Sequence, residues 1–581
     1  METVTAGRAA VEALRGEGVR FVFGLPGGHV LSIYDALHST PEIRHVLVRH
    51  EQAAASMAAA HAQLTGEPGV CLVTAGPGCT NLLSGIAEAY VGSLPVVVIA
   101  GRGATANVLR GAAQEVATER IFAPVTKWSV RVDRPELVAD ALRQAFATAR
   151  SGKPGPVLVD VPRDVLDAEI PAVPYRPAPA RTRPPADAAL VAAAAEALAG
   201  AERPLVVAGG GAVAADARAE LVELAELLAA PVLTSLAGRG SISDDHPLSC
   251  GGLGAHRTRL SKRLLGEADV VLGVGTRFEE METNWREGST PTPDATYVQL
   301  DVDPVEIGRS LPAAIGLVGD AKAVLAQLVE ALHARGLAPG PYADHPRVRE
   351  AAAELAEIES EIEAMADSTE RPLHPLRVLR AIREAFPRET TIAVDVGCTA
   401  QHVAGATPYF KIFEPRSAIV PSSFYGMGFA AAALPAARLV HPERPAVGFV
   451  GDGSFQMVMN VLPVAAEHGL AVTWCVFDDN ALGSIRDIQQ YRFGERFLGT
   501  EFTVQPDFAR IAEACGCRGE RVEDPDEVEA AVARALEANE AGVPAVLDFA
   551  VSRERLLGSL EHYAFYPREL LERQLRPLGA R

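Results

Sequence analysis

Short apolar runs alternate with Ala- and Leu-rich stretches along the whole chain. The apolar runs, such as RFVFGLPGG, GVCLVTAGPG and LPVVVIAG, are rich in β-branched residues and end in glycine or proline. The stretches between them, such as TVTAGRAAVEALRGEG and EQAAASMAAAHAQLTG, have the composition and length of helices. Strands that are apolar on both faces are typical of parallel sheets covered by helices. The pattern predicts an α/β protein built from doubly wound parallel sheets.

Two stretches interrupt this alternation and suggest domain boundaries. The Pro- and Ala-rich segment 171–189 has the composition of an extended linker, and a weaker break lies at 333–348. We therefore expect three α/β domains at 1–170, 190–335 and 365–560, which suits a chain of 581 residues.

Charge and cysteine content exclude several classes of protein. The chain has 54 Lys and Arg against 74 Asp and Glu, a net charge of −20, which disfavours binding to nucleic acid or to an anionic membrane surface. No run of about 18 uncharged apolar residues predicts a transmembrane helix. Seven scattered cysteines are typical of a reduced protein, so we expect a cytoplasmic location.

The most informative segment lies in the third domain. The turn Gly451-Asp452-Gly453-Ser454 follows the apolar run AVGFV, SFQMVMNVLPVAAEHG is expected to form a helix, and a second run, LAVTWCVFDDN, ends in acids. Ligands bind at the carboxyl ends of parallel strands, and a glycine-rich turn that opens a helix presents N–H groups to phosphate. Acidic oxygens there could hold Mg²⁺. The alternative is a solvated turn with unrelated acids.

This segment resembles the thiamin diphosphate (ThDP) motif, in which GDGS is followed after about 27 residues by a polar pair. The resemblance implies Asp452 as the first Mg²⁺ ligand, Asp479 as the second and the Ala481 carbonyl as the third. The family usually has Asn at the second place, so Asp479 adds a negative charge, and the neighbouring Asn480 is the alternative ligand. Gly451, Gly453 and Ser454 would contact the cofactor.

A second motif lies in the first domain. Glu51 follows HVLVRH and begins an Ala-rich helix, where an acid is ordinarily stabilised by the helix dipole. However, HEQAAASMA with AGPGCTN about 25 residues later resembles the pyrimidine-binding domain of ThDP enzymes, especially the acetolactate synthase group. The resemblance then covers nearly the whole chain, in the order pyrimidine-binding, central and diphosphate-binding domain. It implies that Glu51 contacts the pyrimidine N1′ and promotes loss of the C2 proton.

The same resemblance implies an assembly and further cofactor contacts. In the family Glu51 and Asp452 of one site come from two subunits, so a homodimer is the minimum and a homotetramer is expected. PSSFYGMGFAAAALPAA resembles the segment GTMGFGLPAA, which makes Met427 the wedge that bends the cofactor and the Tyr425 carbonyl an acceptor for its 4′-amino group. By itself, Met427 could equally be a core residue. The other implied contacts are Pro26, Thr74, Pro77 and Asn81 at the pyrimidine and Gly397, Cys398 and Thr399 at the diphosphate.

Four residues bear on the substrate. His29, in GLPGGHV, stands where acetolactate synthases usually have a small residue and benzaldehyde lyase-like enzymes have His; it could transfer a proton, or be a surface histidine. Gln114 matches the family's FQE segment, and Ala113 replaces its Phe and widens the pocket. His402 takes the place of a Trp that favours 2-oxo acid acceptors.

Departures from the family pattern in the central domain disfavour FAD. GTRFEEM stands in place of GARFDDR, so that Met281 replaces an Arg, and GGLGAHRTR breaks the pattern GMLGMHG. The glycine cluster at 209–211 is weak evidence for a dinucleotide.

These residues predict a ThDP- and Mg²⁺-dependent carboligase similar to acetolactate synthase. It would decarboxylate a 2-oxo acid, with pyruvate as the expected substrate, and transfer the acyl group to a second carbonyl compound. The alternatives are a 2-oxo acid decarboxylase, a benzaldehyde lyase-like acyloin lyase or ligase, and a non-catalytic regulatory homologue. The presence of Glu51, Asp452 and Met427 together disfavours the last of these.

Overall fold

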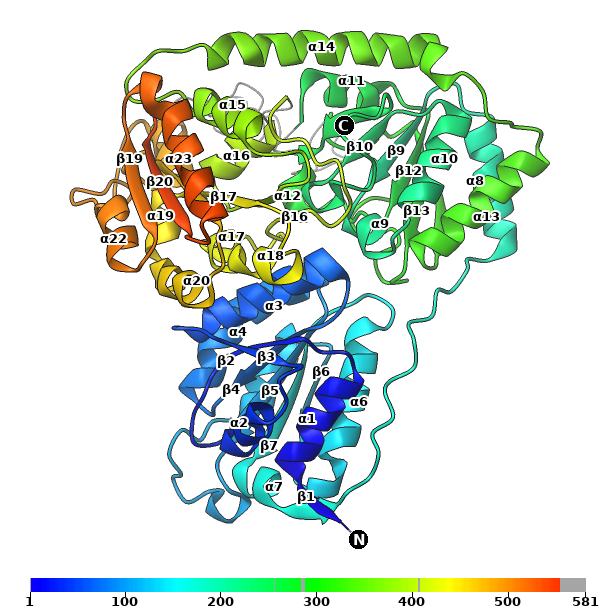
Figure 1. Ribbon diagram of the computed structural model, residues 1–581. Coiled ribbons are helices and arrows are strands. Elements are labelled where there is room, and N and C mark those ends of the chain that lie inside the picture. The colour runs from blue at the N-terminus through cyan, green and yellow to red at the C-terminus, as the bar shows by residue number, and fades with distance from the viewer. Residues whose placement is uncertain (1, 255–256, 284–287, 406–407, 554–581) are drawn as a thin grey trace.

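The computed structural model describes residues 2–254, 257–283, 288–405 and 408–553, and Figure 1 shows its architecture. The described residues form three six-stranded parallel sheets in chain order, each with helices packed against it. This confirms the predicted fold class. Residues 1 and 554–560, which the predicted domains include, lie outside the described residues.

The first domain is built on a sheet with the strand order β3-β2-β4-β5-β7-β6. Its strands are β2 (Phe21–Leu25), β3 (Arg44–Leu47), β4 (Gly69–Val73), β5 (Val96–Arg102), β6 (Trp128–Arg131) and β7 (Val157–Pro162). Its longer helices are α1 (Ala6–Gly16), α2 (Leu31–His38), α3 (Glu51–Thr65), α4 (Pro77–Val91) and α6 (Val138–Arg150). A small antiparallel pair, β1 (Thr3–Thr5) with β8 (Glu169–Pro171), joins the two ends of this domain.

The second domain has a different strand order, β11-β10-β9-β12-β13-β14. Its strands are β9 (Pro204–Ala208), β10 (Val232–Thr234), β11 (Ser249–Gly252), β12 (Val270–Val274), β13 (Thr296–Asp301) and β14 (Ile315–Val318). Its longer helices are α8 (Ala188–Ala199), α10 (Arg218–Leu228), α11 (Arg259–Glu267) and α13 (Ala321–Ala334). The extended segment before α8 connects it to the first domain, as the linker composition predicts (Figure 1).

The third domain repeats the strand order of the first, as β16-β15-β17-β18-β20-β19. Its strands are β15 (Thr391–Val394), β16 (Ala418–Ile419), β17 (Ala446–Gly451), β18 (Thr473–Asp478), β19 (Arg518–Val522) and β20 (Ala545–Ala550). Its helices include α15 (Pro375–Ala385), α16 (Cys398–Gly405), α17 (Phe429–Ala433), α18 (Pro435–Val440), α21 (Gly483–Phe493), α22 (Phe508–Ala514) and α23 (Val528–Glu540).

One local prediction was wrong. The residues after the GDG turn do not form one helix but α19 (Asp452–Gln456), a short 3₁₀ turn (Met459–Val461) and α20 (Leu462–His468). Pro463 occupies the first turn of α20, and because proline has no N–H it cannot continue a helix that begins at Asp452.

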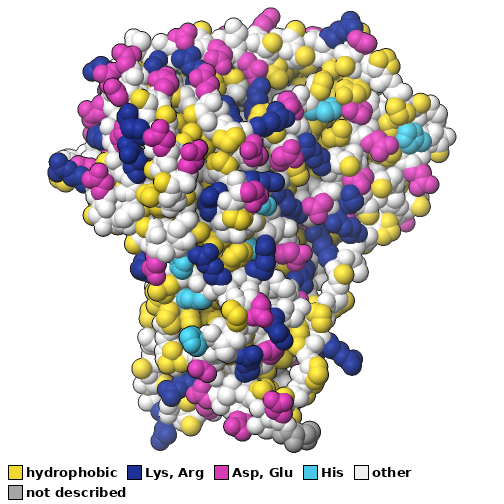
Figure 2. Space-filling model, in the orientation of Figure 1, with side chains coloured by type: hydrophobic (Ala, Val, Ile, Leu, Met, Phe, Trp, Pro, Cys, Tyr) yellow, Lys and Arg dark blue, Asp and Glu magenta, His cyan; other side chains and the backbone are white. Residues whose placement is uncertain are grey.

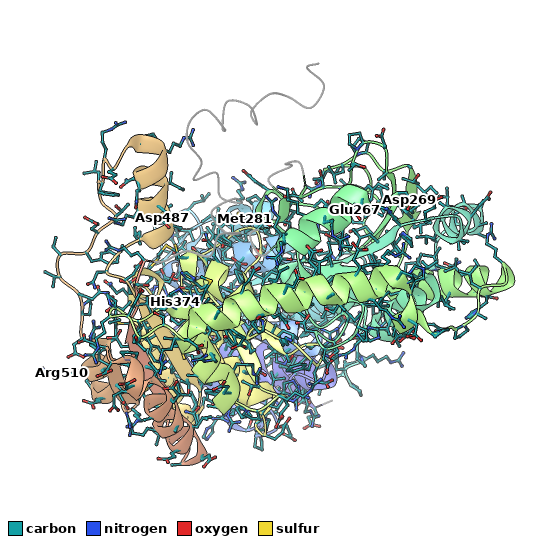
Figure 3. All side chains as sticks on the ribbon, turned by 90° about the horizontal axis from the view of Figure 1, so that it is seen from above. Glu267, Asp269, Met281, His374, Asp487 and Arg510 are labelled. Carbon is teal, nitrogen blue, oxygen red and sulfur yellow. The ribbon has the colours of Figure 1, made fainter. Side chains whose placement is uncertain are left out.

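The first and third domains share one apolar core. Helix α3, rich in alanine, packs closely on α17 and α18, and the buried side chains continue from Phe23 of the first sheet to Trp474 of the third. The long helix α14 (Pro346–Ala366) lies across the second and third domains (Figures 1 and 3). It is tied to α11 by ion pairs from Arg259 to Glu361 and from Arg263 to Glu354.

The surface and the thiols are consistent with the composition. Acidic and basic side chains are interspersed over the face drawn in Figure 2. Among the described residues, no helix combines the length and the apolar character needed to cross a membrane. All seven cysteines lie in the described part of the chain and are in the reduced, thiol form.

Candidate functional site

Asp452 lies at the carboxyl end of strand β17, at the point where the strand order of the third sheet reverses. The chain passes from β15 to one side of the sheet and from β17 to the other, and ligands bind in the crevice at such a switch point. Asp452 is 2% exposed; its Oδ1 accepts from the Gly453 N–H at 2.9 Å and its Oδ2 from Gln505 Nε2 at 2.7 Å.

Acidic groups are concentrated around Asp452. Burial and the nearby charges of Asp479 and Asp478 raise the pKa of Asp452 to about 8. Arg521 Nη1 pairs with Asp478 Oδ2 at 2.7 Å and so compensates that carboxylate. The remaining acidic oxygens favour a cation beside Asp452, and oxygen donors of this kind are those that Mg²⁺ prefers. The described residues contain no cluster of three or more His, Cys, Asp or Glu side chains suited to a metal, so a backbone oxygen would have to complete the donor set.

A cavity of about 250 Å³ opens in front of these acids and brings together the residues that the sequence predicts for the diphosphate half. The predicted residues in its lining are Gly397, Cys398, Thr399, His402, Tyr425, Met427, Gly451, Asp452, Gly453, Ser454, Asp479 and Ala481. Asn480, the alternative metal ligand, is not part of the lining; its backbone carbonyl accepts from the Phe502 N–H at 3.0 Å. The geometry therefore favours Asp479 over Asn480.

A glycine and a helix N-terminus line one part of this cavity. A Cβ at Gly453 would lie 2.8 Å from Leu482 Cδ2, so a side chain there would require the Leu482 side chain to move. Gly483 and Ser484, at the N-terminus of α21, also line the cavity, and helix N-termini bind anions. These two residues were missed from the sequence, although the turn-forming LGS after the acidic pair was a usable signal.

Glu51 begins α3, as predicted, in the first domain. The carboxyl group is 6% exposed, and Asn81 Nδ2, on the first turns of α4, donates to its Oε2 at 2.9 Å. A Cβ at Gly78 would lie 3.5 Å from Glu51 Oε1 and only 2.9 Å from Thr74 Cγ2, so a glycine keeps this side of the carboxyl group open. The predicted pair Glu51 and Asn81 is thus assembled within one chain.

His29 lies at the corresponding switch point of the first sheet. It follows β2, together with Pro26, while Thr74 and Pro77 follow the neighbouring strand β4. His29 Nδ1 is 3.1 Å from Thr74 Oγ1, a hydrogen bond that joins the two loops. Burial and the charge of Arg163 lower the pKa of His29, so the ring is neutral at neutral pH.

The other predicted substrate residues are divided between the domains. Gln114 has a backbone φ of +62° and lies against the turn at Gly76, where a Cβ would come 2.8 Å from Gln114 Cβ. Gln114 and Ala113 are exposed beside the half-site that holds Glu51. His402, by contrast, is 4% exposed in α16 and lines the cavity of the third domain.

The two half-sites are built from different domains. All residues that line the 250 Å³ cavity lie between Val396 and Ser552 of the third domain. The described polar contact of Glu51 is to Asn81 in the first domain. The cavity beside Asp452 thus contains no residue of the first domain, Glu51 included.

A second cavity, of about 210 Å³, lies where the three domains come together. It is lined by Gly210 and Gly211 after β9, by Arg277 and Met281 of the segment GTRFEEM, and by residues of the other two domains. Glu282 in the same lining is half-buried, and its loss of solvent raises the pKa of its carboxyl group. Met281, labelled in Figure 3, thus lines the cavity at the segment where the sequence raises the question of FAD.

Two further residues near the diphosphate half escaped sequence reasoning. Asp395 is fully buried and accepts hydrogen bonds from the N–H groups of Gly428, at 3.0 Å, and Ala430, at 2.9 Å. Asp487 of α21, labelled in Figure 3, accepts from Cys398 Sγ at 3.7 Å. Asp395 precedes Gly397 in the segment VDVG, but no spacing in the sequence relates either acid to its partner.

Comparison with known proteins agrees with this division into two half-sites. The model "Thiamine pyrophosphate enzyme, N-terminal TPP binding domain" matches residues 4–121, the central-domain model 191–328 and the C-terminal TPP binding domain model 395–549. A "Probable acetolactate synthase large subunit" from Methanocaldococcus jannaschii is 35% identical, covering 94% of this chain and 91% of the relative. "Acetolactate synthase isozyme 3 large subunit" from Escherichia coli is 36% identical, covering 92% and 93%.

Proposed function

This chain belongs to the thiamine pyrophosphate-dependent enzymes, in their acetolactate synthase group, and on that premise we propose that it is a carboligase acting on 2-oxo acids. It decarboxylates a 2-oxo acid, with pyruvate as the expected substrate, and joins the remaining acyl unit to a second carbonyl compound. The observation that carries the proposal is the pair of half-sites at the carboxyl ends of two sheets with the same strand order, Glu51 with Asn81 in one and Asp452 among acids in the other.

The third domain supplies the residues that would hold the cofactor and its metal. Asp452, Asp479 and the Ala481 carbonyl are suited to Mg²⁺, and Gly453 and Ser484 line the same cavity as Thr399. When bound, ThDP would supply a carbon acid and a place for the electron pair that is left when CO₂ departs.

The first domain supplies proton control. Asn81 fixes Glu51 Oε2, which leaves Oε1 on the open side at Gly78 to share a proton with the pyrimidine N1′. Thr74 holds His29 Nδ1, so that Nε2 is the ring nitrogen that can give a proton to the acceptor's oxygen. The pKa of His29 is lowered, so the ring is neutral, and Nε2 carries its single proton when Nδ1 accepts from the Thr74 hydroxyl.

We also propose that the working unit is at least a homodimer, and a homotetramer in its full assembly. The support is that the cavity beside Asp452 contains no residue of the first domain. A partner's first domain would bring Glu51 to it. The oligomeric state follows from sedimentation or light scattering of the purified protein.

A benzaldehyde lyase-like acyloin lyase or ligase is the second candidate for this site. His29, hydrogen-bonded to Thr74 at the switch point, and the small Ala113 favour it, because His29 makes the acceptor side of the pocket more polar and Ala113 makes it wider. Product identification from pyruvate, with and without an aldehyde acceptor, separates the candidates. Acetolactate from pyruvate alone supports the first, a mixed acyloin that forms only with the aldehyde supports the second, and acetaldehyde alone indicates a decarboxylase.

FAD is possible but disfavoured in the proposed enzyme. Met281, a neutral thioether, and the half-buried Glu282 line the second cavity at the segment where the family motif has an arginine. Purified protein that carries flavin absorbance through a desalting column would overturn this point. We place the enzyme in the cytoplasm, in keeping with its seven scattered cysteines.

A further inference from the structure

Segment 420–427 carries two of the predicted cofactor contacts, Tyr425 and Met427, and its backbone is strained at Tyr425. Tyr425 has φ +58°, a left-handed conformation that is costly for a residue with a side chain. Within the segment, the Tyr425 N–H donates to the Ser422 carbonyl at 3.0 Å and the Phe424 N–H donates to Ser422 Oγ at 3.1 Å. These turn contacts alone do not fix where the segment lies relative to the rest of the domain.

A carboxylate of the first domain holds this segment from outside. Glu88 of α4 is 2% exposed. Its Oε1 accepts from the Ser422 N–H, and its Oε2 accepts from the Gly426 N–H at 3.2 Å. One carboxylate thus spans the turn and binds an N–H on each side of Tyr425.

A second side chain of the first domain supports the start of the same segment. Gln63 of α3 donates from Nε2 to the Val420 carbonyl at 2.7 Å and accepts from the Val420 N–H at 3.2 Å. These two hydrogen bonds resemble those that the backbones of neighbouring strands exchange. On the far side of Met427, Asp395 of the third domain accepts from Gly428 and Ala430. The segment is therefore held at one end by its own domain and at the other by the first domain.

We propose that Glu88 is a positioning residue for the cofactor site: it sets the Tyr425 carbonyl and the Met427 side chain against the bound cofactor by holding the backbone between Ser422 and Gly426. The inference rests on the proposed function, because it gives Tyr425 and Met427 their duty at the cofactor. The proposal also gives α4 a role in positioning site residues near each of its ends. Asn81 anchors Glu51 near the N-terminus of α4, and Glu88, two turns later, anchors the segment that carries Tyr425 and Met427.

Only a carboxylate satisfies both N–H groups. A glutamine of the same size has one carbonyl oxygen and would turn an NH₂ group towards the second N–H, which leaves a buried donor without an acceptor. Glu88→Gln therefore removes the hydrogen bond on one side of Tyr425 and leaves the side-chain volume nearly unchanged. Glu88→Asp keeps the charge but is shorter by one methylene, so it reaches one N–H at most.

Glu17 provides a matched control in the same domain. This carboxylate is also buried and also holds a backbone segment, because its Oε1 accepts from the Ala178 N–H and from the Tyr175 hydroxyl, both at 2.7 Å. It lies on the linker side of the domain and contacts no residue of the segment 420–427 in the described structure. Glu17→Gln therefore tests for a general loss of stability.

The first experiment is hydrogen–deuterium exchange by mass spectrometry on full-length protein without cofactor. In Glu88→Gln we expect amides of peptides that cover 421–428 to exchange about 10- to 100-fold faster, the loss of one hydrogen bond to a charged group. In Glu17→Gln these peptides should keep the wild-type rate. Equal exchange in wild type and Glu88→Gln, or equal acceleration in both variants, overturns the proposal. Glu88→Asp replaces Glu88→Gln if the latter does not fold.

The second experiment measures the cofactor. In saturating Mg²⁺ and ThDP, we expect Glu88→Gln to slow deuterium exchange at the cofactor C2 by about 10²-fold with little change in the KM of the 2-oxo acid, as for a catalytic geometry displaced by about 1 Å. Unchanged C2 exchange in a variant whose segment is loosened overturns the positioning assignment alone. If the wild-type protein binds no ThDP with Mg²⁺, the proposed function fails instead, and the two failures are thereby distinguished.

Discussion

The first and third domains have the same strand order, yet they present opposite chemistry at the same place. In both, loops after two neighbouring strands meet at the switch point, β2 and β4 in one and β15 and β17 in the other. In the first domain Glu51, which follows the edge strand β3, lies beside these loops and is held by the neutral amide of Asn81. The third domain places Asp452 among further acids, and the pKa of Asp452 rises to about 8. Topology fixes where a ligand binds, whereas the loop residues decide what is done to it.

The two half-sites also differ in whether they need a ligand to balance their charges. The acids of the third domain repel one another, and on the proposed function a cation between them completes this half-site. Glu51 has its hydrogen-bond partner within the protein, so its half-site is complete before any ligand arrives. We therefore expect variants of the first domain to alter proton transfer and variants of the third to alter binding.

The largest effect should come from Glu51→Gln. The amide cannot share a proton with the pyrimidine ring, so deuterium exchange at the cofactor C2 should slow by roughly 10²- to 10⁴-fold while ThDP affinity changes little. Exchange is followed by NMR after acid quench of the loaded enzyme. Exchange as fast as in the wild type would contradict both the role of Glu51 and the proposed division of labour.

Asp452→Ala should show the opposite profile. Loss of a carboxylate that binds the metal should weaken ThDP binding in Mg²⁺ by at least about 100-fold, since even residues that only orient metal ligands contribute 10- to 100-fold. Calorimetry measures the affinity, and chelation of Mg²⁺ from the wild type should reproduce the loss. An unchanged affinity in the variant would remove Asp452 from the metal site.

His29→Ala sharpens the comparison within the first domain. If His29 serves the acceptor's oxygen, CO₂ release should persist while the ratio of ligation to decarboxylation falls by roughly 10- to 100-fold. The measurement is product analysis against total CO₂. An equal loss of both activities would show that His29 positions the cofactor, and no change would make it a histidine without chemical duty.

The smallest effect is expected from Asp479→Asn. The substitution keeps an oxygen donor and removes one of the charges that raise the pKa of Asp452, so ThDP affinity in Mg²⁺ should stay within about threefold of the wild type. The pKa of Asp452 should fall, because one like charge is removed. A severe loss of binding would show that the negative charge of Asp479 is itself required.

The sequence predicted the features that depend on residues close together in the chain. The apolar runs predict the parallel sheets, and the GDGS turn and the HEQAAASMA segment predict residues that the structure gathers into two half-sites. The break at Pro463 was also visible in the sequence but was outweighed by the apolar periodicity on either side of it.

What escaped prediction depends on contacts between distant residues. Glu88 is 338 residues from Gly426, and Gln505 is 53 residues from Asp452, with no motif that links either pair. In the sequence, Glu88 is only an acid near the end of an apolar helix. The packing of α4 against the third domain brings the backbone N–H groups of Ser422 and Gly426 to its carboxylate. A buried carboxylate with two N–H partners is recognised from geometry and not from spacing.

The separation of Glu51 and Asp452 within one chain has a genetic consequence. On the proposed dimer, a chain with Glu51→Gln and a chain with Asp452→Ala would each be inactive alone, yet a mixed pair would contain one site with both changes and one with neither. Random assortment of the two chains should thus restore about one quarter of the wild-type sites. Two defective alleles would then complement each other in one cell, whereas two alleles altered in the same half-site would not.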